Sequence, residues 1–157
     1  MKLHVYKIKF QHSLFELNED YDRLSEHEKE RISDLDCESF FDYEEHDDKY
    51  VCYIISNINE IDKYSKILFK NLIMHEIIDL SNDIIKFKID LETELKPLLS
   101  TINSIKYSFF IDDINDWIIQ HLNIDDVLDR IIDVGYDNLT TFEKFYLNNN
   151  TEIIKKE

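Results

Sequence analysis

The sequence predicts an α+β fold: a mixed β-sheet with a packed helix in a β-α-β unit, followed by a helical C-terminal subdomain. Three observations predict this class. Runs rich in β-branched and aromatic residues recur through 1–111, an amphipathic helical stripe lies between two of them, and helical spacing dominates from 112 onward. We therefore expect a sheet domain at 1–111 and a helical subdomain at 112–157, packed as one compact unit because no Gly-, Ser- or Pro-rich linker separates them.

The chain begins with a predicted strand at 3–10, which is rich in strand-forming residues and carries charges at alternate positions near its end. Ser25 and Glu28 then have the spacing of a capping box, in which the serine caps a helix start and the glutamate reaches back to it. This spacing predicts a short polar helix that ends near Leu35.

A hairpin and a strand–helix–strand unit are predicted next. The strands at 40–43 and 50–55 flank the acidic stretch 44–48, which indicates a hairpin. Asn59 opens a helix, and 73–80 has the composition of a strand beside it. Strand, helix and strand within about 30 residues are typical of a β-α-β unit with a right-handed crossover. The predicted helix buries one stripe, made of Ile61, Tyr64, Leu68 and Leu72.

The middle of the chain contains two more strand candidates. Residues 85–91 alternate apolar with charged or polar side chains, as in a half-buried strand, and 105–111 is a further strand candidate. Pro97 lies between them and is expected at a helix start or in a turn, because a proline inside a helix costs about 3 kcal/mol.

From Asp112 the pattern is helical. Gly135 is the only glycine, and we expect it at the end of a helix, where a positive φ is needed. Thr140 and Glu143 form a second capping box that opens a last helix to about Leu147. The predicted apolar faces consist of Ile114, Trp117, Ile118 and His121 or Leu122 in one helix, and Val127, Leu128, Ile131 and Ile132 in the next.

The excess of acid is the unusual property of the composition. The chain has 34 acidic and 18 basic residues, and its net charge of −16 lies well beyond the magnitude of about 2–8 that keeps a small domain soluble. AT-rich codon usage explains scarce glycine and alanine, but it favours lysine and does not explain the acidity. The charge is concentrated in 16–49, with 15 acidic against four basic residues, and in 111–133, with seven Asp against one Arg. It opposes direct nucleic-acid binding.

The N-terminal sequence carries Lys7 and Lys9 where a secretory signal would be apolar. No run of the chain approaches the roughly 18 apolar residues of a membrane span. Cys37 and Cys52 are therefore expected as free thiols in a reducing cytosol. These observations predict a cytoplasmic protein without a membrane partner.

No motif with catalytic chemistry has supporting context. One glycine cannot build a phosphate-binding loop, the six histidines are dispersed, and neither cysteine has a basic neighbourhood that would activate its thiol. The DDxxD motifs at 112–116 and 125–129 resemble the Mg²⁺-binding motifs of isoprenoid synthases. Those enzymes, however, are larger helical bundles with the motifs far apart. We expect no enzyme activity, no cofactor and no metal, with a weak Mg²⁺ or Ca²⁺ site in this region as an alternative.

Residues 126–147 contain a pattern of apolar and helix-capping residues at regular spacing. It consists of Asp126, Leu128, Ile131, Gly135, Leu139, Thr140, Glu143 and Leu147. It resembles the short helical tail that follows the membrane domain of some bacterial rhomboid-type proteins. The membrane domain, with its catalytic serine and histidine, has no counterpart here, so the resemblance implies a bacterial helical hairpin and no protease activity.

Two clusters interleave aromatic and acidic side chains. Aromatic rings can act as desolvated anchors while carboxylates accelerate encounter with a basic protein. We therefore expect a basic protein partner, as for an immunity protein that occludes the active site of a toxin nuclease. The alternatives are an adaptor or structural subunit of a larger assembly, a phage anti-defence protein that mimics DNA, an enzyme with a deep pocket of convergent polar groups, and a solvated acidic face. The candidate residues are Tyr43, Glu44, Glu45, Asp47 and Asp48 on the hairpin, and Asp112, Asp113, Asp116 and Trp117 at a helix start.

Overall fold

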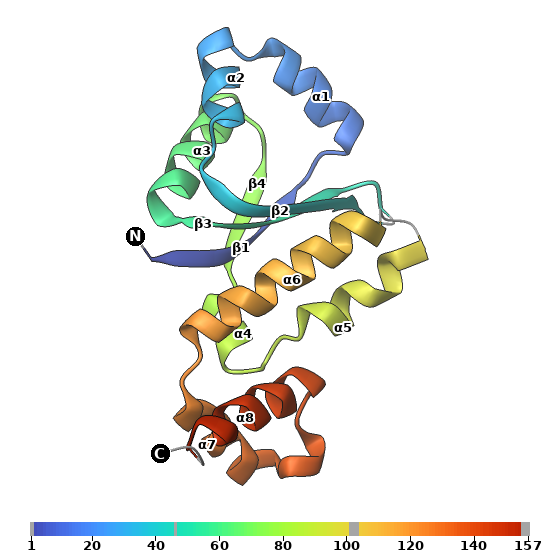
Figure 1. Cartoon of the computed structure of the whole chain (residues 1–157). Helices are drawn as coiled ribbons and strands as arrows, with labels where there is room; N and C mark the ends of the chain where they lie inside the picture. The colour runs from blue at the N-terminus through green and yellow to red at the C-terminus, as the bar shows by residue number, and fades with distance from the viewer. Residues whose placement is uncertain (1, 46, 101–103, 155–157) are drawn as a thin grey trace.

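The computed structural model describes residues 2–45, 47–100 and 104–154 of the chain (Figure 1). Parts of the expected hairpin loop, sheet domain and helical subdomain fall on residues 1, 46, 101–103 and 155–157, and these parts lie outside the described residues.

Within the described residues the chain forms one four-stranded sheet with the strand order β2-β3-β1-β4. Its strands are β1 (Leu3–Phe10), β2 (Cys37–Glu44), β3 (Tyr50–Asn57) and β4 (His75–Asp79). The predicted β-α-β unit is present as β3, helix α3 (Ile58–Lys70) and β4. Because β1 lies between β3 and β4 and runs against both, every pair of neighbours is antiparallel, and the sheet is not mixed as expected. The α+β class is confirmed.

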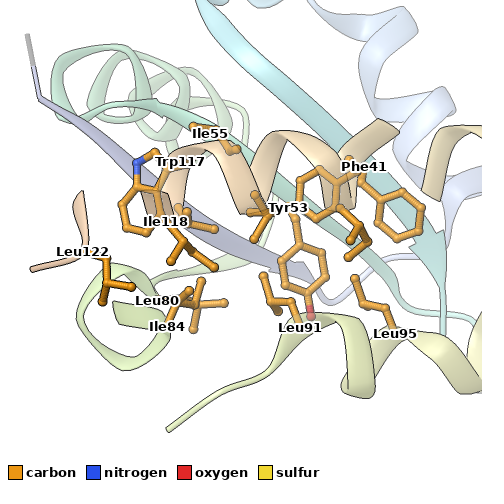
Figure 2. Close-up of a cluster of buried hydrophobic side chains, with 14 of the residues drawn as sticks. Phe41, Tyr53, Ile55, Leu80, Ile84, Leu91, Leu95, Trp117, Ile118 and Leu122 are labelled. Carbon is orange, nitrogen blue, oxygen red and sulfur yellow. The ribbon is translucent and has the colours of Figure 1, made fainter. Parts of the chain in front are cut away.

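Alternation along β1 builds a separate core on each face of the sheet. Tyr6 and Ile8 point toward α3, where they pack with Ile61 and Leu68. Val5 points to the opposite face and packs with residues of the long helix α6 (Ser104–His121). Figure 1 shows α3 and α6 on opposite sides of the sheet. The core on the α6 side is the larger of the two and includes Phe110 and Ile114. Figure 2 labels other members of this core, among them Phe41, Tyr53, Trp117 and Leu122.

Most of the remaining helices lie at the two ends of the molecule, and α4 (Ser81–Ile85) and α5 (Leu91–Leu95) lie beside α6 (Figure 1). Two helices that connect β1 to β2 lie together with α3, and the C-terminal helices lie beyond α6 at the opposite end (Figure 1). In chain order these elements are α1 (Leu14–Arg23), α2 (Glu26–Ser33), α4, α5, the 3₁₀ turn η1 (Lys96–Ser100), α7 (Ile124–Val134), the 3₁₀ turn η2 (Tyr136–Asn138) and α8 (Thr141–Ile154).

Several local signals in the sequence are confirmed. Both predicted capping boxes form, at the starts of α2 and α8. Pro97 lies in η1 and not inside an α-helix. Gly135 follows α7 with a φ of 79°, as expected for the position after a helix. Helix α3 is capped by Asn57, one residue before its first turn, and Leu72 lies beyond its end with a φ of 59° and 83% exposure, outside the buried stripe.

The two strands predicted in the middle of the chain are wrong. Residues 85–91 contain the end of α4 and a turn, closed by hydrogen bonds from the Lys88 and Ile89 N–H groups to the Asp83 carbonyl. Phe87 lies in this turn with a φ of 52°, which is incompatible with a strand. Residues 105–111 belong to α6, which also runs through the boundary expected between 111 and 112. Helix α1 was not predicted.

Candidate protein-binding site

The acidic residues of the hairpin are partly used within the protein. The Glu44 carboxylate accepts a hydrogen bond from the Leu14 N–H at 2.7 Å, which ties β2 to the start of α1. The Asp47 carboxylate is 2.6 Å from the Lys49 ammonium group, which lowers the pKa of Asp47. Asp48 is exposed in the turn with a φ of 60°. Two of the four predicted carboxylates are therefore already paired.

The Tyr43 side chain packs against the core on the α6 side of the sheet. Its ring stacks on Tyr53 with 6.4 Å between ring centroids, and burial raises the pKa of its hydroxyl. The Lys7 ammonium lies 5.3 Å from the centre of the Tyr53 ring. Glu45 and Glu94 line the same hollow. The aromatic pair of Tyr43 and Tyr53 therefore already lies beside a cation of this protein, Lys7.

The acidic residues of α6 differ from those of the hairpin. Asp112, Asp113 and Asp116 are exposed, and within the described ranges none of these carboxylates forms a hydrogen bond or ion pair. Trp117, predicted beside them as an anchor, is only 2% exposed and points into the core (Figure 2). Its indole N–H donates to the Leu3 carbonyl at 3.1 Å, so the ring is unavailable to a partner.

The structure does not join the two predicted clusters into one site. Helix α6 approaches β2 through Lys106, whose ammonium group is 2.8 Å from the Asp42 carboxylate. Asp112 lies six residues further along α6, a rise of about 9 Å, and faces helix α8. The hairpin and the α6 carboxylates therefore belong to different surfaces.

A groove lies between α5, α6 and α8, and Asp112 and Asp116 form part of its rim. Its outer part also contains Ile119 and Phe145, which are 45% and 56% exposed. Its inner part is a pocket of about 280 Å³, and residues 89–93 line one side of it. The two parts share Glu92, Asn115, Thr141 and Phe142, and we refer to them together as the α6–α8 groove.

The inner pocket has an apolar floor and a mostly acidic mouth. Asp90 and Glu92 supply carboxylates, and Lys96 is the one cationic side chain among the described residues that line the groove. Asp90 also caps α5, because its carboxylate accepts hydrogen bonds from the N–H and hydroxyl of Thr93. The floor consists of Ile84, Phe87, Ile89, Leu91, Ile111, Ile114, Ile118 and Phe142.

Of the acidic residues of this groove, sequence reasoning identified Asp112 and Asp116 and missed those at the start of α5. It also missed the aromatic residues of α8 that line the groove. Phe142 and Phe145 are three residues apart in α8, so helical spacing alone places them on one side of that helix. The signal was present as two aromatic residues in a short helix. Which helix they face depends on tertiary packing.

The described residues offer no group of three or more His, Cys, Asp or Glu side chains placed to bind a metal ion. Cys37 and Cys52 are free thiols, and burial raises the pKa of both. Over the ranges that the structure describes, no helix combines the length and the apolar character needed to cross a membrane.

Comparison with protein-family models, curated proteins and solved structures gives no match for this chain. The resemblance of residues 126–147 to a rhomboid-type tail therefore stays a prediction from the sequence.

Proposed function

We propose that this protein is a non-enzymatic acidic binding protein, and specifically a bacterial inhibitor of the immunity-protein type that occludes the basic active site of a toxin nuclease. One observation carries the proposal: among the residues that the structure describes, Asp112 and Asp116 are unpaired carboxylates on the rim of a groove that also exposes the apolar side chains of Ile119 and Phe145. Carboxylates without internal partners can pair with lysine or arginine of another protein, and the groove can desolvate the contact.

The mechanism is steric occlusion with electrostatic attraction. A net charge of −16 draws a basic protein toward the molecule and accelerates encounter, and salt screens this attraction. The α6–α8 groove then holds the complex through ion pairs at its rim and through contact with its exposed apolar side chains. No cofactor enters this mechanism, and we propose that the inhibitor acts in the cytoplasm.

An adaptor role in a larger assembly is the second candidate. Phe69 in the last turn of α3, and Leu72 and Met74 just after it, are 80%, 83% and 55% exposed. Exposed apolar side chains next to one another in the chain are a property of assembly surfaces. Because contact through these side chains is apolar, an adaptor that used them would bind with little dependence on salt.

The test is affinity capture with the full chain immobilised, at about 0.1 M and about 1 M NaCl, where the screening length falls from about 10 Å to about 3 Å. The inhibitor proposal expects capture of a basic protein at low salt, its release at high salt, and loss of that protein's own activity when the purified chain is added. Salt-resistant capture of an assembly favours the adaptor.

Two matched variants place the binding face. The double variants Asp112→Lys/Asp116→Lys and Glu45→Lys/Asp48→Lys change the net charge equally, so any difference between them is local. We expect the α6 variant to abolish capture and the hairpin variant to weaken it only modestly. Equal loss in both variants contradicts a specific role of the groove.

A further inference from the structure

The inner pocket of the α6–α8 groove is small. Its volume of about 280 Å³ lies just below the range of about 300–1,000 Å³ that holds small-molecule ligands. Apolar residues from α4, α5 and α6 form its floor. One aromatic or large aliphatic side chain would bury its surface there.

The charged residues around the pocket determine which residues can flank that inserted side chain. Asp112 and Asp116 lie on the side of α6, and Glu92 lies on α5 across the groove. A segment with cationic groups on both sides of an apolar anchor can pair with both. A phosphate or acidic segment would meet these carboxylates with like charge, and Lys96 supplies a single cation against them in the inner pocket, so such a ligand is disfavoured.

The outer part of the groove extends the apolar contact beyond the pocket. Phe145 and Ile119 are exposed at neighbouring positions of α8 and α6. Such side chains at the edge of a pocket can cover an inserted residue and exclude water from it. The three features lie in one groove: a pocket with an apolar floor and a polar mouth, a carboxylate on each side, and exposed apolar residues beside them.

We infer that the α6–α8 groove binds a short segment of a basic protein, in which one aromatic or large aliphatic side chain lies between two lysine or arginine residues. The inference rests on the proposed function and deepens it, because it names the chemistry of the segment that the groove accepts. The aromatic side chain occupies the pocket, and the flanking cations pair with Glu92 on one side and with Asp112 and Asp116 on the other.

The test uses the isotope-labelled full chain and the tripeptide acetyl-Lys-Trp-Lys-amide, with binding followed by NMR. We expect saturable shifts of the amides of Asn115, Thr141 and Phe142, which line both parts of the groove. Two further peptides separate the contributions. Acetyl-Lys-Ala-Lys-amide lacks the anchor and acetyl-Glu-Trp-Glu-amide reverses the charge, and we expect both to bind at least about tenfold more weakly, a difference of about 1.4 kcal/mol.

Matched substitutions assign the contacts. Asp116→Asn should weaken the tripeptide about 2–5-fold, the range for one exposed ion pair, whereas Asp113→Asn, on the same helix but outside the groove, should change it less than about twofold. Phe145→Ala should weaken binding, and Phe109→Ala should not, although Phe109 is 67% exposed on α6. An unchanged amide spectrum outside the groove shows that each variant is folded.

Equal binding of the three peptides, or equal effects of Asp113→Asn and Asp116→Asn, overturns the inference. Because the tripeptide experiment needs no natural partner, its failure is separate from failure of the proposed function. An inhibitor that captures and inactivates a basic protein, yet gives no tripeptide binding in the groove, has the proposed function with a different recognition surface.

Discussion

Glu143 is the most deeply buried charged residue that the structure describes, with 0% exposure. Its carboxylate accepts the Thr140 N–H at 2.6 Å and the Arg130 Nε–H at 3.1 Å, so one side chain caps α8 and ties it to α7. The sequence predicted the capping box. It could not predict the ion pair, because Arg130 is 13 residues away on another helix.

Replacing Glu143 by alanine should lower the free energy of unfolding by about 3 kcal/mol. This is the low end of the range for breaking a buried ion pair, and it is chosen because Arg130 is partly exposed. Urea unfolding followed by circular dichroism measures it. Thr140→Ala removes only the cap and should cost about 1 kcal/mol. If the two variants lose the same stability, the ion pair with Arg130 contributes nothing.

The lowered pKa of Glu28 predicts a contribution to stability that is lost in acid. Hydrogen bonds from Lys70, Ser25 and Asn71 lower the pKa of Glu28 from 4.5 to about 2. A carboxyl group whose pKa is lowered by folding stabilises the folded state fully above its ordinary pKa, and this contribution is lost as the pH falls to the folded value. The window is therefore between about pH 4.5 and about pH 2.

The variant Glu28→Gln should flatten the dependence of the unfolding free energy on pH within that window. Urea unfolding at a series of pH values measures the slope. Lys70→Met removes the largest cause of the lowered pKa, and it should shift the acid transition upward. A slope in Glu28→Gln identical to that of the original chain would show that other carboxyl groups account for the acid sensitivity.

Among the elements, α1 is held less firmly than its neighbours. None of its residues is buried. Its start is fixed by the Ser13–Glu16 capping box and by the Leu14 N–H bonded to Glu44, while Leu17 packs against the smaller core. A helix with little buried surface opens locally at a lower free energy than core strands.

Hydrogen exchange should therefore be faster at the amides of α1 than at those of β1 and β3. Ser13→Ala should increase exchange in α1 further while leaving the midpoint of global unfolding nearly unchanged, because the cap contributes about 1 kcal/mol to the helix alone. Mass spectrometry of exchanged peptides measures both effects. Exchange of α1 at the global rate would show that it unfolds only with the sheet.

Local sequence signals predicted most elements, and in α6 they failed where adjacent apolar residues hid the helical period. In α6, Phe110 and Ile111 are buried while Phe109 is exposed, so three adjacent apolar residues hide the helical period and resemble a strand. In 85–91, alternation was real, but the positive φ of Phe87 turned the chain. Helix α1 carried the same Ser-x-x-Glu signal as α2, and this signal could have predicted it.

The same limit applies to the candidate site. Asp112 and Asp116 could be selected from the sequence because acidic residues cluster there. Glu92 and Phe145 could not, since they meet α6 only through the packing of α5 and α8, which are distant in sequence. Trp117 was selected for its neighbours and is buried, because it lies on the side of α6 that faces β1.

At the scale of the whole molecule, the two acidic regions of the sequence reach opposite ends and meet where α6 packs on β2 (Figure 1). Region 16–49 forms α1, α2 and β2, and region 111–133 forms most of α6 and α7, with the sheet between α2 and α7 (Figure 1). Separation reduces repulsion between the two regions but leaves it strong within each. The ion pairs available to offset it, such as those of Lys63 and Lys106, are largely exposed and individually weak.

The balance between self-repulsion and ion pairing predicts how stability responds to salt. With a net charge of −16, screening should relieve more repulsion than it removes attraction, so the midpoint of thermal unfolding should rise between about 0.01 M and about 0.1 M NaCl. Relief of about 1 kcal/mol corresponds to about 2–4 °C for a domain of this size. Calorimetry in NaCl and KCl should give the same rise, since general screening does not depend on the cation. A midpoint that falls with salt would mean that the ion pairs outweigh the repulsion, and a rise in only one salt would indicate specific ion binding.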